Sequence, residues 1–103
     1  PLPYSVVALE DCRFTRLPVP TYRRLIREQP AWADYHRRQL EAHLLTKERK
    51  EEFLLLQTPE QRVVAFHQNF SDLARRIPDY LIASYLAMTP ISYSRIKKRL
   101  KLT

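Results

Sequence analysis

The C-terminal part of the chain is rich in side chains that can bind negatively charged groups. Residues 78–103 contain five bases and a single acid, Asp79. Guanidinium and ammonium groups donate hydrogen bonds to phosphate oxygens. The whole chain contains 18 Lys and Arg and 11 Asp and Glu. A need for solubility alone would explain this excess of positive charge. The clustering instead favours a polyanionic partner. The five bases are Arg95, Lys97, Lys98, Arg99 and Lys101.

Residues capable of covalent or metal chemistry lack the neighbours that such chemistry needs. Cys12 lies in a predicted turn, with no histidine and carboxylate evidently placed to activate it. His36 and His43 are too far apart on one helix to bind a metal together. We expect these two to be solvated histidines on helix faces, and His67 also lies on a predicted helix without an evident carboxylate partner. Without glycine there is no glycine-rich phosphate loop, so we expect neither an enzyme nor a cofactor.

Two short predicted helices with a corner between them must hold the basic residues. Pro78 can open a helix, and Thr89-Pro90 repeats the start signal of a capping hydroxyl followed by proline. The first helix is therefore expected to end near Leu86, with Ala87-Met88 as the corner. On the second helix, Tyr93, Ile96 and Leu100 share an apolar face, whereas the polar face carries Ser92, Arg95, Lys98 and Arg99.

A helix with an apolar back and a cationic front fits three settings. It can be a solvated helix of a bundle, a helix on a membrane surface, or the second helix of a helix-turn-helix in the major groove of DNA. Residues 77–100 resemble the DNA-binding end of the Crp/Fnr superfamily, bacterial transcription regulators related to the catabolite activator. The matching residues are Pro78, Ile82-Ala83-Ser84-Tyr85-Leu86, Thr89-Pro90 and Ser94-Arg95-Ile96-Lys97-Lys98.

The resemblance implies sequence-specific binding of double-stranded DNA by a homodimer, with RNA polymerase as a further partner. The fork of Arg95 matches the O6 and N7 acceptors of guanine. Tyr80 is expected to reach a phosphate, and Ile91 a thymine methyl group. Phosphates or nearby base edges would be held by Thr89, Ser92 and Lys98.

Two positions depart from the family pattern. Ala87 stands where relatives usually have glycine, and a left-handed backbone costs a non-glycine residue roughly 1–2 kcal/mol. Ile91 stands where relatives commonly carry a polar base-reading residue. A second hypothesis therefore stays open: a degenerate family member that dimerises and contacts protein without specific DNA binding.

The beginning of the chain is predicted to contain two strands. Residues 4–10 and 13–17 are rich in β-branched and aromatic residues and are separated by a polar turn. The run at 6–11 resembles the V-x-A-L-E-D run near the end of the superfamily's cyclic-nucleotide-binding β-roll. Cyclic-AMP binders carry an Arg-Ser pair where this chain has Leu2 and Pro3. The resemblance thus argues against cyclic-AMP binding.

The middle of the chain is predicted to be helical. Thr21 caps a short helix that ends near Glu28. Residues 31–57 have apolar stripes on two faces and correspond to the dimerisation helix of the family, although the polar stretch 47–52 leaves its continuity open. A capping box, formed by Thr58 and Gln61 around Pro59, begins the next helix.

The expected architecture is mainly α with a small β portion (α+β). It comprises residual β-roll strands and a short helix in 1–30, a dimerisation helix in 31–57, and a winged-helix-like helix-turn-helix domain in 58–103. Because the first residue is proline, we expect the segment to begin partway through a longer protein. No apolar run approaches the roughly 18 residues of a membrane span, and the single cysteine cannot form an internal disulfide, so we expect a cytoplasmic protein without membrane contact.

Overall fold

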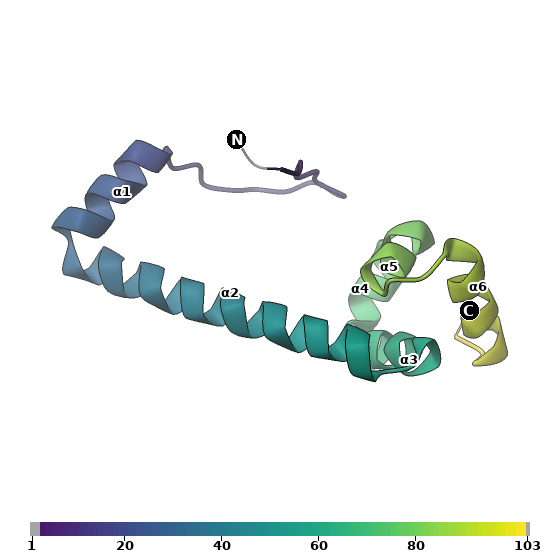
Figure 1. The fold of residues 1–103 in the computed structure, drawn as a ribbon. Helices are drawn as coiled ribbons and strands as arrows, with labels where there is room; N and C mark the ends of the chain where they lie inside the picture. The colour runs from purple at the N-terminus through teal and green to yellow at the C-terminus, as the bar shows by residue number, and fades with distance from the viewer. Residues whose placement is uncertain (1–2, 103) are drawn as a thin grey trace. The chain divides into compact units, whose positions relative to one another are not determined.

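The computed structural model describes residues 3–102, which form helices after an irregular first segment (Figure 1). The mainly helical class is confirmed. Two compact units, residues 1–45 and 46–103, divide the chain, and the boundary falls within the second helix. In chain order the helices are α1 (Val19–Glu28), α2 (Pro30–Leu56), α3 (Pro59–Asn69), α4 (Ser71–Arg76), α5 (Asp79–Tyr85) and α6 (Pro90–Arg99).

The predicted small β portion is wrong for the residues that the structure describes. Residues 4–10 and 13–17 form no strand, and Val6 and Phe14 are 84% and 80% exposed. A pair of strands is marginal in water without further strands or a packed helix, and residues 3–102 offer this segment no sheet to join. The expectation that concerned Leu2 lies outside the described residues.

The first unit is held by aromatic contacts between α1 and the start of α2. The Tyr22 ring lies edge-on to Trp32 and His36, and a 3.0 Å hydrogen bond joins its hydroxyl to Nδ1 of His36. His36 is thus not the purely solvated histidine that we expected. The helix α1 begins at Val19, before the predicted cap Thr21. Pro20 is tolerated in the first turn because the N–H groups of a first turn have no partner within the helix.

The helix α2 is continuous through the polar stretch 47–52, which settles the question that the sequence left open. Lys, Glu and Arg have high helix propensity, and the chain has no glycine to interrupt them. None of the helices between residues 3 and 102 combines the length and apolar character that crossing a membrane requires.

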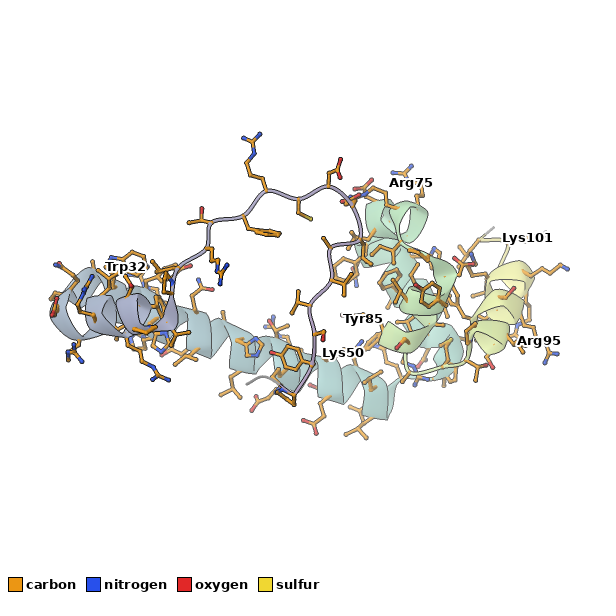
Figure 2. The ribbon with its side chains drawn as sticks, turned by 90° about the horizontal axis from the view of Figure 1, so that it is seen from above. Trp32, Lys50, Arg75, Tyr85, Arg95 and Lys101 are labelled. Atoms are coloured by element: carbon orange, nitrogen blue, oxygen red, sulfur yellow. The ribbon has the colours of Figure 1, made fainter. Side chains whose placement is uncertain are left out.

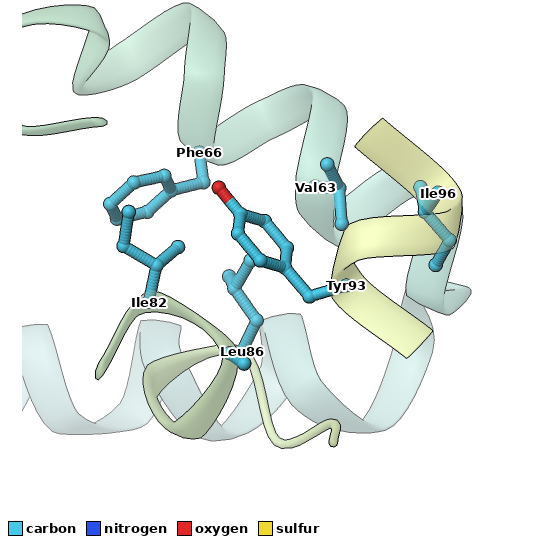
Figure 3. Packing of buried hydrophobic residues seen from close by; sticks show 7 residues of the cluster. Val63, Phe66, Ile82, Leu86, Tyr93 and Ile96 are labelled. Atoms are coloured by element: carbon cyan, nitrogen blue, oxygen red, sulfur yellow. The ribbon is translucent and has the colours of Figure 1, made fainter. Parts of the chain in front are cut away.

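The second unit contains a hydrophobic core formed by α3, α5 and α6. Figure 3 shows the Tyr93 ring near its centre, close to Phe66 of α3 and Leu86. The predicted capping box starts α3: Gln61 N–H donates to Thr58 Oγ1 at 3.2 Å, and Thr58 N–H donates to Gln61 Oε1 at 2.9 Å. The buried residues are Val63, Phe66, Ile82, Ala83, Leu86, Tyr93 and Ile96.

The corner between α5 and α6 lies where the sequence predicts it. Ala87 has φ 57°, the N–H of Met88 donates to the carbonyl of Ala83 at 3.0 Å, and that of Ala87 donates to Ser84 at 3.1 Å. This pair of bonds is the Schellman arrangement, which is usually completed by glycine. The helix α6 ends in the same way with Lys101 at φ 58°. A chain without glycine accepts roughly 1–2 kcal/mol of backbone strain at each of these positions.

Candidate nucleic-acid interface

The orientation of α6 is set by its apolar back. Tyr93 is fully buried and Ile96 is 7% exposed, so this face is fixed against the core of the second unit. The neighbouring positions Ser92, Arg95 and Lys98 are exposed. The predicted division of α6 into an apolar and a polar face is therefore confirmed, and the polar face is accessible to a partner.

The bases of α6 fall into two groups. Lys97 forms a 2.9 Å ion pair with Asp79 at the start of α5, and Nε of Arg99 donates to Glu60 in the first turn of α3 at 2.8 Å. These two bases fasten α6 to its neighbours. Among residues 3–102, no ion pair involves Arg95 or Lys98, so their charges face solvent uncompensated. Figure 2 shows Arg95 and Lys101 pointing away from the rest of the second unit.

The start of α6 carries two coupled hydroxyls. Thr89 is its N-cap and accepts from the Ser92 backbone N–H at 3.1 Å. The Thr89 hydroxyl also donates to Ser92 Oγ at 3.0 Å. Ser92 keeps its own hydroxyl proton, which can be donated outward to an acceptor. Thr89 therefore orients Ser92, while its own donor is already used.

The remaining predicted contact residues are exposed but come from two helices. Ile91, at 65% exposure, belongs to the first turn of α6, whereas Tyr80, at 60% exposure, belongs to the first turn of α5. The structure thus gathers five predicted residues on α6 or its cap. In the described residues no hydrogen bond or ring contact links Tyr80 to them.

His67 occupies a place that the sequence did not predict. It is half-buried, and a 2.8 Å hydrogen bond joins its Nε2 to the hydroxyl of Tyr93 on α6. Burial, followed by the negative charge of Asp79, raises the pKa of Tyr93 to about 12. Burial, followed by the positive charge of Lys97 and opposed by Asp79, lowers the pKa of His67. No local sequence pattern indicates this contact, because it joins residues that are 26 positions apart in the chain.

Acidification is expected to destabilise the second unit through His67. Because folding lowers the pKa of His67, the unfolded chain binds a proton at this histidine more tightly than the folded chain does. The stability that neutral His67 contributes is therefore fully present above about pH 6.5, and it is lost as the pH falls toward the lower pKa of the folded state. Urea unfolding of His67→Gln between about pH 7 and pH 5 should show a shallower loss of stability than the unmodified protein. His43→Gln, at an exposed position of α2, is the control and should leave the slope unchanged. Equal slopes for all three proteins would contradict this role.

The described residues contain no group of three His, Cys, Asp or Glu side chains placed to hold a metal ion. Comparison with models of protein families, with curated proteins and with solved structures finds no match. The helix α6, fixed by its apolar back, presents a guanidinium, an ammonium and an oriented hydroxyl to solvent.

Proposed function

We propose that this chain is a sequence-specific DNA-binding transcription regulator of the Crp/Fnr type, acting as a homodimer in the bacterial cytoplasm and contacting RNA polymerase. One observation carries the proposal: α6 is fixed from behind by Tyr93 and Ile96 while Arg95 and Lys98 face solvent without partners among the described residues. A helix so mounted after a tight corner has the form of a recognition helix, which enters the major groove.

Each exposed side chain has a role in this arrangement. Arg95 reads a guanine through its O6 and N7 acceptors, and Ile91 contacts a thymine methyl group. Ser92, oriented by Thr89, donates to a phosphate or a nearby base edge, while Tyr80 and Lys98 contact phosphates. Phosphate contacts set the position of the protein, and the Arg95 contact supplies most of the sequence preference.

The salt dependence of binding tests the phosphate contacts. We expect Lys98→Ala to weaken binding to all duplexes alike and to lower the slope of log K against log salt by about 1, because one phosphate contact is lost. Titration of random duplex DNA at about 50 and about 200 mM salt measures that slope. Lys47→Ala, which removes an exposed charge of α2, should not change it. Parallel slopes for Lys98→Ala and the unmodified protein would remove Lys98 from the interface.

The exposed leucines of α2 support the homodimer. Leu40, Leu44 and Leu45 are 56%, 59% and 46% exposed along one helix, an apolar surface that a second copy would cover. A dimer with two-fold symmetry would place its two α6 helices in successive major grooves about 34 Å apart.

Sedimentation of the unmodified protein should give twice the chain mass of 12.4 kDa, and Leu44→Glu should reduce the measured mass to that of one chain. The control Gln39→Glu adds the same charge at another exposed position of α2 and should remain dimeric. A single-chain mass for the unmodified protein would exclude this dimer.

The exposure of Ile91 favours one second candidate function, a dimerising module that contacts protein. At 65% exposure an isoleucine is as suited to an apolar partner as to a thymine methyl group. The same random-duplex titration separates the candidates. Steep salt dependence supports the DNA-binding function, and the absence of binding at about 50 mM salt supports the protein-binding module.

A further inference from the structure

A cleft of about 450 Å³ opens in the second unit. It lies between the last turns of α2, the second half of α3 and the end of α5. Its volume falls within the range of small-molecule sites, which are mostly apolar with a few polar groups. Four aromatic rings line it, together with two cations, and no carboxylate belongs to its lining. The aromatic residues are Phe53, Phe66, Phe70 and Tyr85, and the cations are Arg49 and Lys50.

Lys50 is a cation without a counter-ion in the wall of this cleft. Its Nζ lies 2.9 Å from the centroid of the Tyr85 ring and donates a hydrogen bond to the Tyr85 backbone carbonyl (Figure 2). A lysine ammonium has three donors, and no ion pair in residues 3–102 engages Lys50. Burial, followed by the positive charge of Arg62, lowers its pKa to about 8. A half-buried ammonium held beside aromatic rings is poorly compensated, and an anion that enters the cleft would compensate it.

We infer that the cleft binds a small aromatic carboxylate, with its ring among the phenylalanines and its carboxylate on Lys50. The ring would be buried by the same aromatic surface that lines the cleft. The carboxylate would accept the unused donors of Lys50, and Arg49 at the exposed mouth would add attraction. An uncharged ligand of the same shape would leave the ammonium without a counter-ion. This site does not depend on DNA binding, and its test requires no DNA.

Two probes of equal shape test the assignment by calorimetry with the full chain: 2-naphthoate and its uncharged counterpart 2-naphthamide. At pH near 7 we expect saturable binding of 2-naphthoate that is about tenfold or more tighter than that of 2-naphthamide, since only the carboxylate forms an ion pair with the Lys50 ammonium. Lys50→Met keeps an unbranched side chain of nearly the same length without the ammonium, and it should abolish this preference. Lys47→Met removes a neighbouring charge that does not line the cleft and should preserve it.

Two further measurements guard against a folding defect in Lys50→Met. Thr46 is exposed at the cleft mouth, one helical turn before Lys50, so a glutamate there can pair with the ammonium. Thr46→Glu should therefore weaken the binding of 2-naphthoate and leave the affinity for 2-naphthamide unchanged. In the unmodified protein, affinity for 2-naphthoate should fall as pH rises from about 7 to about 9.5, because Lys50 then loses its proton. Equal affinity for the two probes, an unchanged preference in Lys50→Met and Thr46→Glu, or no saturable binding at millimolar concentration would each overturn the site.

Discussion

Leu86→Ala is expected to lower the free energy of unfolding of the second unit by about 2–5 kcal/mol. The side chain is fully buried where α5 ends and the corner begins, so its removal leaves a cavity beside Tyr93 (Figure 3). Urea unfolding followed by circular dichroism measures the effect. Because small domains are stabilised by roughly 5–15 kcal/mol in total, this change would be a substantial fraction of the stability of the unit.

Ile91→Ala provides the matched control for Leu86→Ala. Ile91 is a comparable aliphatic residue but is 65% exposed on α6, and its truncation should change stability by no more than about 0.5 kcal/mol. If Leu86→Ala were no more destabilising than Ile91→Ala, the core that supports α6 would be assigned incorrectly.

Arg95→Ala is expected to weaken binding to the preferred duplex by about 1–3 kcal/mol and to remove discrimination at one base pair. The loss has two parts, a charge and a planar fork that pairs with guanine. Arg95→Lys keeps the charge and loses the fork, so it should retain the salt slope and lose the discrimination. Competition between duplexes that differ at single base pairs measures both quantities.

Arg75→Ala is the control for the charge removed at Arg95. Arg75 is exposed on α4, where it pairs with Asp72 at 3.5 Å, and lies outside the proposed contact face. Its removal should leave sequence preference unchanged. An Arg95→Ala protein with intact affinity and intact preference would eliminate Arg95 as the base-reading residue.

Local signals made several parts of the fold predictable from the sequence. The capping box of Thr58 and Gln61 and the cap Thr89 act within a few residues of each other, so their spacing alone defines two helix starts. The corner at Ala87 follows because one helix must end before the next can begin. The buried back of α6 follows from helical periodicity.

Other features depend on contacts between distant residues, and sequence reasoning missed them. His67 meets Tyr93 across 26 positions, and Lys50 meets Tyr85 across 35, so no local pattern marks either residue. Helical periodicity also placed Arg99 on the polar face with Arg95, yet only the packing of α6 on α3 brings Arg99 to Glu60. The prediction of two strands was wrong because a segment of β-rich composition forms no stable sheet without neighbouring strands.

We propose that the outer face of α6 meets duplex DNA. This contact is tested most directly by following the backbone amide resonances of the isotope-labelled chain while a duplex selected from a random pool is added. We predict that the resonances of Thr89 and of residues 91–98 shift first and furthest, and that the shifts diminish when Arg95 is replaced by alanine. Shifts confined to other residues, or no change in these resonances at saturating DNA and about 50 mM salt, would contradict this contact.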